Sequence, residues 1–208
     1  MARETKEERI QRMTALERPL WDKGAWVGGV DEAGRGPLAG PVVAACVVMP
    51  EAPLLPEIND SKKVPEKKRD VLYDEILRIA KAVGVGVATV EEIETLNIKA
   101  AARLAMKRAI EQAKPPRIFV DAERDLDVDM PQQAIVHGDA VSYSVAAASI
   151  VAKVTRDRMM RELDAQYPLY GFAQHKGYGT QAHYEALRQH GPCPAHRKLF
   201  IRSAFEKR

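Results

Sequence analysis

Four acidic residues follow stretches of the sequence that are predicted to be β-strands. Asp31 and Glu32 end the first such stretch, Asp121 ends the fourth, and Asp139 follows the fifth. Ligand sites of α/β folds gather near strand ends, so we expect these side chains to lie close together. Neighbouring carboxylates repel each other unless they are protonated or bind cations, and oxygen-only ligands suit Mg²⁺ or Mn²⁺ rather than zinc. Each acid alone is better explained as a turn or cap residue, but four at successive strand ends favour a metal site.

A glycine-rich turn, Gly34–Arg35–Gly36, comes directly after the first two acids. The spacing to Gly40 and the strand that follows exclude a dinucleotide-binding fingerprint. Such a turn can present backbone N–H groups to an oxygen at close range, although a plain tight β-turn is an equally good interpretation.

Tyr178 lies between two glycines, where an aromatic ring stacks on a sugar or base, or covers the edge of a core. Lys62 and Lys63 precede a helix and could contact phosphate or stay solvated.

Hydrophobic periodicity and breaker residues predict the elements that must position these side chains. Five strands are expected, at residues 26–30, 41–49, 83–90, 117–122 and 133–140. Helices are expected at residues 3–18, after Pro65, from about Thr95 to the prolines at 115–116, at 142–168, and within 179–191. The first strands are hairpin-like neighbours and the later ones alternate with helices. This order predicts an α/β fold with a mixed sheet flanked by helices.

The composition is that of a folded domain, because 46% of the 208 residues are apolar. The longest apolar run, residues 42–49, is too short to cross a bilayer, and the charged N-terminus has no secretory signal, so no membrane partner is expected. Two isolated cysteines suggest reduced thiols and a cytoplasmic protein.

Residues 151–208 carry 11 Lys and Arg against 5 Asp and Glu, although the whole chain has a net charge of only +3. A basic segment beside an acidic site fits a polyanion held against metal, or is an ordinary solvated helix surface.

Six motifs together resemble bacterial ribonuclease HII, the type 2 ribonuclease H, in the same order from about Trp21 to Phe205. They are "GVDEAGRGPLAGPVVAACVV", "NDSKK", "LNIKAAARLAM", "GDAVSYSVAAASIVAKVTRD", "HKGYGT" and "HGPCPAHRKLF". The Asp-Glu-Ala-Gly-Arg-Gly segment alone is close to specific for that family. One position departs from the family pattern, because Ala122 follows Asp121 where the family usually has glycine, and we expect its effect to be confined to the geometry of that turn.

The resemblance implies a ribonuclease H-like, mixed five-stranded sheet flanked by helices, with a helical C-terminal part at about 165–208. It divides the chain into an N-terminal helical extension, 1–20, and a catalytic domain, 21–208. It implies an endoribonuclease that hydrolyses the phosphodiester 5′ of a ribonucleotide, in RNA–DNA hybrids and in duplex DNA containing single ribonucleotides. The products would carry 3′-hydroxyl and 5′-phosphate ends, and the enzyme is expected to act as a monomer.

The resemblance also implies roles for individual residues. Two Mg²⁺ or Mn²⁺ ions roughly 4 Å apart would activate water and stabilise the leaving oxygen, and both the catalytic residues and the metal ligands would be Asp31, Glu32, Asp121 and Asp139. The backbone of the glycine-rich turn would bind the 2′-hydroxyl, Tyr178 would stack near the sugar, and lysines would hold phosphates; this substrate-binding set is Gly34, Arg35, Gly36, Lys62, Lys153 and Tyr178. The alternatives are a non-catalytic duplex-binding module and another metal-dependent nuclease of the same fold.

Overall fold

The structure is a computed structural model and describes residues 4–123 and 125–206. Its centre is a five-stranded sheet with the spatial order β3-β2-β1-β4-β5. The first three strands along the chain pair antiparallel, whereas β4 runs parallel to β1, and β5 runs parallel to β4. The strands are β1 Gly28–Ala33, β2 Val42–Val48, β3 Ala82–Ala88, β4 Ile118–Asp121 and β5 Gln132–Ile135. The predicted mixed sheet is therefore confirmed.

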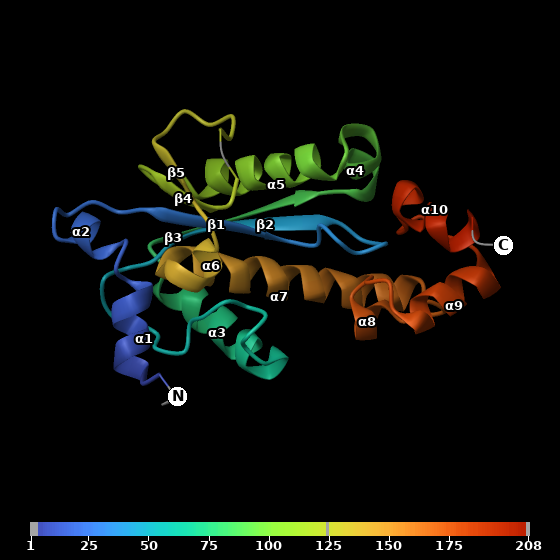
Figure 1. The fold of residues 1–208 in the computed structure, drawn as a ribbon, viewed down its shortest axis with the longest axis horizontal. Coiled ribbons are helices and arrows are strands. Elements are labelled where there is room, and N and C mark those ends of the chain that lie inside the picture. Colours follow the sequence, from blue (N-terminus) through green and yellow to red (C-terminus); the bar gives the residue numbers. More distant parts are fainter. Residues whose placement is uncertain (1–3, 124, 207–208) are drawn as a thin grey trace.

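Two long helices cover the two faces of this sheet, α5 (Ile98–Ala113) on one face and α7 (Tyr143–Gln166) on the other (Figure 1). Glycines on the strands allow the helices to approach closely. A Cβ atom on Gly29 would lie 2.0 Å from the backbone carbon of Ser144 in α7, and one on Gly86 would lie 2.0 Å from the Ala105 oxygen in α5. The α7 backbone is therefore held directly against β1, the strand that carries Asp31 and Glu32.

The remaining helices surround this core. They are α1 Lys6–Met13, α2 Arg18–Trp21, α3 Glu66–Ile79, α4 Val90–Leu96, α6 Gly138–Val141, α8 Phe172–His175, α9 Gln181–His190 and α10 Lys198–Glu206. Figure 1 shows α8, α9 and α10 gathered beyond the end of α7, where the turn between β1 and β2 reaches toward them. Hydrogen bonds join that turn to this C-terminal part, from Leu38 N–H to the Gly177 oxygen and from Gly40 N–H to the Ala195 oxygen, both at 2.8 Å.

Several predicted element boundaries differ from the structure. The first strand is Gly28–Ala33 rather than 26–30, so Asp31 and Glu32 lie within β1 and not after its end. The helix expected from about Thr95 is two helices, α4 and α5, because Asn97 has a positive φ of 72° and its side chain caps the start of α5. The fifth strand ends at Ile135 rather than at residue 140, since His137 also has a positive φ, and Asp139 lies in the short helix α6. Of the helix expected at 3–18, residue 3 is outside the described chain and the remainder forms α1 and the start of α2.

The N-terminal segment that forms α1 and α2 contacts the junction of α6 and α7. Glu17 has no exposed surface, and its Oε1 accepts hydrogen bonds from the Ser142 hydroxyl at 2.6 Å and from the Ser144 N–H at 3.0 Å. Arg12 donates to the Ala140 carbonyl at 2.5 Å. These contacts hold the junction of α6 and α7, two to three residues from Asp139.

Among residues 4–123 and 125–206, no helix is long and apolar enough to span a bilayer.

Candidate metal centre and nucleic-acid site

Three of the four predicted acids come together at one edge of the sheet. A carboxylate oxygen from each of Asp31, Asp121 and Asp139 lies within 4.8 Å of the other two. The parallel pairing of β1 and β4 explains the first two, because parallel strands end at the same edge of a sheet. Asp121 Oδ1 accepts a hydrogen bond from the Gly138 N–H at 2.7 Å, which draws α6 and hence Asp139 to the same place. The sequence prediction of a shared acidic site is consistent with this geometry.

Asp31 and Asp121 are held in a setting that disfavours their negative charge. Burial raises the pKa of Asp31 well above its ordinary value, and the charges of Glu32, Asp121 and Asp139 raise it further. Burial also raises the pKa of Asp121, although the Gly138 hydrogen bond opposes that shift. A divalent cation would relieve this repulsion, and three clustered carboxylates are a donor set that suits Mg²⁺ or Mn²⁺. The residues present therefore fit such an ion.

Glu32 is directed to a different partner. Its Oε1 lies 3.3 Å from Arg35 Nη1, and the same nitrogen lies 3.3 Å from Glu123 Oε1. Burial raises the pKa of Glu32, whereas Arg35 lowers it. The structure thus places Glu32 beside the three aspartates in an ion pair with Arg35. Glu123 was not predicted from the sequence; its only signal is its position two residues after Asp121.

The glycine-rich turn after β1 has one strained position. Gly34 has φ of +101°, and a Cβ atom there would lie 2.1 Å from Arg156 Nε, so the position requires glycine. Gly36 has no positive φ, and a Cβ atom on it would meet only a carbon of the Tyr178 ring, at 3.9 Å. Tyr178 is 44% exposed. The predicted turn and the predicted stacking residue therefore lie next to each other, and the Tyr178 ring is partly exposed.

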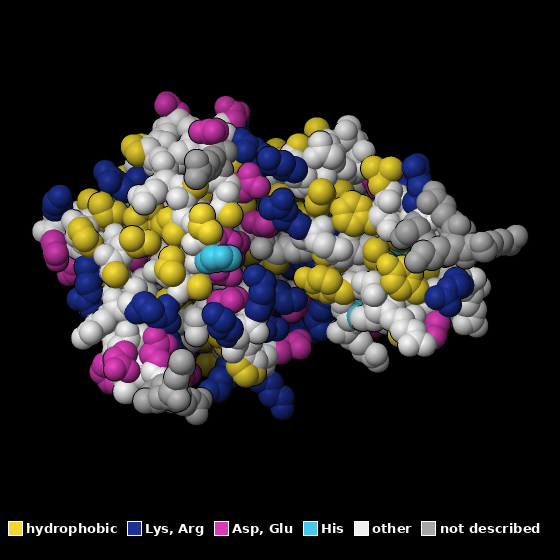
Figure 2. Space-filling model, in the orientation of Figure 1, with side chains coloured by type: hydrophobic (Ala, Val, Ile, Leu, Met, Phe, Trp, Pro, Cys, Tyr) yellow, Lys and Arg dark blue, Asp and Glu magenta, His cyan; other side chains and the backbone are white. Residues whose placement is uncertain are grey.

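The two predicted phosphate-binding lysines lie in different surroundings. Lys62 Nζ is 3.4 Å from Asp139 Oδ2, and its side chain is largely exposed. Burial alone would lower the pKa of Lys62, but the charges of Asp139, Asp60 and Asp31 together raise it. Lys153 Nζ donates to Asp157 at 2.7 Å and lies 5.9 Å from the centre of the Tyr178 ring; burial lowers its pKa. Figure 2 shows Lys and Arg side chains gathered around acidic ones in the middle of this face.

Two buried arginines were not predicted as site residues. Arg197 and Arg156 are 0% and 1% exposed, and their guanidinium groups bind backbone carbonyls of the turn after β1. Arg197 stands in the "HGPCPAHRKLF" motif, where its neighbours suggest nothing about burial. No sequence periodicity could have revealed them, because most of their partners are carbonyl groups of a segment more than 100 residues away.

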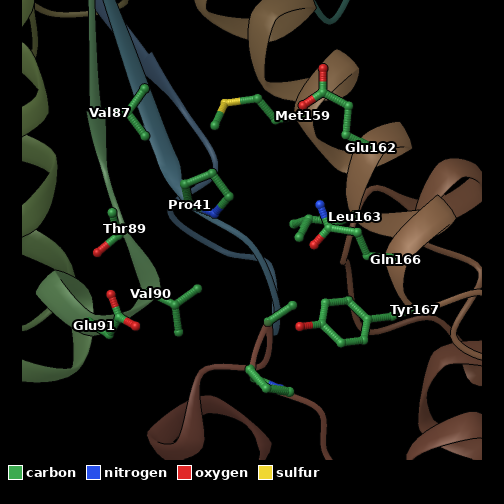
Figure 3. Close-up of a pocket in the computed structure, with 12 residues that line it drawn as sticks. Pro41, Val87, Thr89, Val90, Glu91, Met159, Glu162, Leu163, Gln166 and Tyr167 are labelled. Atoms are coloured by element: carbon green, nitrogen blue, oxygen red, sulfur yellow. The ribbon is translucent and has the colours of Figure 1, made fainter.

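A separate groove lies between β3 and α4 on one side and α7 on the other, with a volume of about 360 Å³. Figure 3 shows the side chains of Thr89, Val90 and Glu91 opposite those of Leu163, Gln166 and Tyr167. None of the proposed metal ligands or substrate-binding residues lines it. The groove is thus distinct from the aspartate cluster, which lies at an open edge of the sheet.

The sheet order and the acidic cluster at the ends of its parallel strands define a nuclease of the ribonuclease H-like class. The crystal structure of the ribonuclease H2 from Pyrococcus horikoshii OT3 superposes with a TM-score of 0.72 at 29% identity, covering 86% of this chain and 96% of that one. The family model for Ribonuclease HII matches residues 28–207.

Curated relatives lead to the same family. The Ribonuclease HII of Caldanaerobacter subterraneus subsp. tengcongensis is 50% identical over 197 residues, 93% of this chain and 82% of the relative. That of Lactobacillus delbrueckii subsp. bulgaricus is 53% identical over 197 residues, 94% and 76% of the two chains. The chain belongs to the ribonuclease HII family. It is a metal-dependent endoribonuclease that acts on RNA-containing nucleic acid, and the alternative of a non-catalytic binding module is wrong.

Proposed function

We propose that this enzyme hydrolyses the phosphodiester on the 5′ side of a ribonucleotide, both in RNA–DNA hybrids and at single ribonucleotides in duplex DNA. The products carry 3′-hydroxyl and 5′-phosphate ends. The observation that supports this proposal most is the juxtaposition of two features. The carboxylates of Asp31, Asp121 and Asp139 lie within 4.8 Å of one another, and the glycine turn that follows β1 faces the exposed Tyr178. The strand β1 and its turn thus connect the proposed metal site to the proposed sugar site.

The acids are proposed as the metal ligands. These residues would hold Mg²⁺ or Mn²⁺, which would supply an activated water and positive charge near the leaving 3′ oxygen. Asp31, Asp121 and Asp139 are already clustered for this role. Arg35 contacts only Oε1 of Glu32, at 3.3 Å, so Glu32 completes the proposed set through its other carboxylate oxygen while Arg35 orients it. We therefore assign Arg35 a second role, as the partner that holds Glu32.

The remaining groups bind the nucleic acid. The backbone N–H groups of Arg35 and Gly36 contact the 2′-hydroxyl, the group that distinguishes RNA from DNA. Tyr178 stacks on the neighbouring sugar, and Lys153 beside it contacts a phosphate. Lys62 at the rim of the aspartate cluster is placed to contact the scissile phosphate. We further propose that the enzyme acts in the cytoplasm as a monomer, with a catalytic domain at 21–208 and a helical extension at 1–20.

A test of the proposed ligands compares three neutral variants with a matched control. Asp31→Asn, Asp121→Asn and Asp139→Asn should each abolish cleavage of a single-ribonucleotide duplex and retain duplex binding, because each removes a charge and keeps the shape. Asp129→Asn changes an exposed acid outside the cluster and should leave the rate unchanged. Near-normal turnover by any of the three site variants under saturating Mg²⁺ would remove that residue from the metal centre. Cleavage of an all-DNA duplex by the wild type would favour a general nuclease of the same fold.

A further inference from the structure

The buried guanidinium of Arg197 binds a series of carbonyl groups in the turn after β1. It donates to the oxygens of Gly34 at 2.6 Å, Arg35 at 3.0 Å, Pro37 at 2.9 Å and Gly40 at 2.8 Å. No carboxylate forms a salt bridge with it among the described residues. Burial lowers the pKa of Arg197 to about 9, so it remains a cation at neutral pH. A buried cation with only carbonyl partners is unusual, since burying a charge is costly unless its hydrogen bonds are satisfied.

The position of these carbonyls determines where the N–H groups of the same peptide units point. In a trans peptide the C=O and N–H bonds point in opposite directions, and neither peptide in question is cis. The carbonyls of Gly34 and Arg35 are directed at Arg197, so the N–H groups of Arg35 and Gly36 are directed away from it. Within the described chain, no backbone hydrogen bond uses either of these N–H groups. A Cβ atom placed on Gly36 would have only a carbon of the Tyr178 ring within 4 Å, at 3.9 Å.

We infer that Arg197 is a positioning residue for recognition of the ribose: it holds the turn so that the N–H groups of Arg35 and Gly36 face the 2′-hydroxyl. This inference rests on the proposed function. The positive charge also polarises the two peptide units and strengthens their N–H groups as donors. Arg197 acts from the far side of the turn and does not touch the substrate.

Arg156 provides a matched control. It is equally buried and also binds carbonyls of the same turn, those of Pro41 at 2.9 Å and Ala39 at 3.1 Å. It does not bind the carbonyls of Gly34 or Arg35, whose peptide units carry the two free N–H groups. Replacing either arginine by lysine keeps a cation and removes part of a hydrogen-bonded network. The two variants should therefore lose similar stability, but only Arg197→Lys should impair recognition of the sugar.

The experiment measures the dissociation constants of two duplexes that differ by one 2′-hydroxyl, in the absence of divalent metal so that neither is cut. Folding of each variant is checked by circular dichroism. The wild type should bind the single-ribonucleotide duplex roughly three- to tenfold more tightly than the all-DNA duplex, as one net hydrogen bond allows. Arg197→Lys should bring this ratio close to one, and Arg156→Lys should keep it. A folded Arg197→Lys that keeps the wild-type ratio, or an equal loss in both variants, overturns the inference.

A second measurement needs no variant. In nuclear magnetic resonance spectra of the wild type, the N–H signals of Arg35 and Gly36 should shift on addition of the single-ribonucleotide duplex and shift less with the all-DNA duplex. Equal shifts with both duplexes would contradict the inference. The proposed function is tested separately by cleavage with Mg²⁺ or Mn²⁺. If the wild type fails to cut at the ribonucleotide, the proposed function is wrong; if it cuts and Arg197→Lys still discriminates, only the role of Arg197 is wrong.

Discussion

The Nε2 atoms of His183 and His196 lie 3.0 Å apart in the buried C-terminal part, and their other nitrogens fix which ring carries the shared proton. His183 Nδ1 lies 2.9 Å from the Tyr178 carbonyl and must donate to it, so its Nε2 is an acceptor. His196 Nδ1 accepts from the Cys193 N–H at 3.0 Å, so its Nε2 is the donor. Both rings are therefore neutral, and together they connect the 193–196 segment to the backbone of Tyr178.

This pair makes the C-terminal part sensitive to acid. Burial lowers the pKa of His196 to about 4, with the neighbouring His183 adding to the effect, and burial also lowers the pKa of His183. A lowered histidine pKa gives stability that is complete above the unfolded value of about 6.5 and is lost as the pH falls toward the folded value. We expect the free energy of unfolding to fall by up to about 1.4 kcal/mol per pH unit for each such histidine below pH 6.5.

The check is urea unfolding between pH 7 and pH 4 for the wild type and for His196→Gln. The variant should be less stable at pH 7, because the hydrogen bond to His183 is weakened, but its stability should depend less on pH. His190→Gln, at an exposed position, serves as the control and should keep the wild-type slope. If His196→Gln also keeps that slope, the neutral histidine pair does not account for the sensitivity to acid.

Asp31 should limit the stability of the metal-free enzyme. Burial and the neighbouring carboxylates raise the pKa of Asp31 in the folded protein above its ordinary value of 3.8. The protonated side chain therefore stabilises the fold below pH 3.8, and this stabilisation is lost as the pH rises through the pKa of the folded protein. At pH 7, Asp31→Asn should therefore raise the melting temperature of the metal-free protein. Mg²⁺ or Mn²⁺ at about 100 times its dissociation constant should stabilise the wild type by about 2.7 kcal/mol. The variant should lose most of that gain; equal stabilisation of both proteins by metal would contradict Asp31 as a ligand.

Tyr178 should matter for the substrate and not for the metal. Loss of stacking of an aromatic ring on nucleic acid costs roughly 1–3 kcal/mol, so Tyr178→Ala should lower cleavage at a single ribonucleotide by about tenfold to a hundredfold. Tyr178→Phe keeps the ring and should retain most of the activity, because no hydrogen bond of the hydroxyl is present among the described contacts. Metal-induced stabilisation should be the same in all three proteins. Unchanged cleavage by Tyr178→Ala would contradict stacking of Tyr178 on the substrate and leave this residue only a role in loop packing.

Ala122 occupies a backbone conformation that favours glycine. Its φ is +51°, in the left-handed region, and its N–H donates to the Ile135 carbonyl at 3.0 Å. Ala122→Gly should therefore stabilise the protein by about 0.5–1 kcal/mol without changing the metal ligands. The matched control is Ala186→Gly within α9, which should cost about 1 kcal/mol. Thermal unfolding measures the stability of both variants against the wild type. A lower melting temperature for Ala122→Gly would contradict the inference that the backbone at Ala122 favours glycine.

The sequence was sufficient to predict the mixed sheet and the strand ends that carry Asp31 and Asp121, because both depend on local apolar runs and on the way strands pair. It was not sufficient to place Asp139 in a helix, since the end of β5 is set by the left-handed backbone of His137 and by the Gly138 N–H that Asp121 binds. The glycines of the turn predicted a close approach of its backbone to a ligand oxygen, which stays a prediction; within Gly34–Arg35–Gly36, the position that requires glycine by its φ is Gly34 and not Gly36.

The network behind the turn could not be predicted, for a different reason. Arg197 looks like one more residue of a basic tail, and composition favours a solvated side chain there. Its burial depends on the packing of the C-terminal helices against the turn after β1, a contact between distant parts of the chain. Long-range polar contacts of this kind leave no periodic pattern in a single sequence. The same holds for Glu17, whose partner Ser142 lies 125 residues away.

The most direct test of the central claim maps the cut in one set of labelled duplexes. The target sugar carries a 2′-hydroxyl, a 2′-hydrogen or a 2′-O-methyl group, and each duplex is offered with Mg²⁺, Mn²⁺ or chelator. We expect a single cut on the 5′ side of the ribonucleotide, with either metal, and no cut with chelator or with the other two sugars. A site that binds a hydroxyl rejects analogues without it because its own polar groups then stay unpaired. If the wild type cuts the 2′-hydrogen duplex nearly as fast, or cuts on the 3′ side of the ribonucleotide, the account is contradicted.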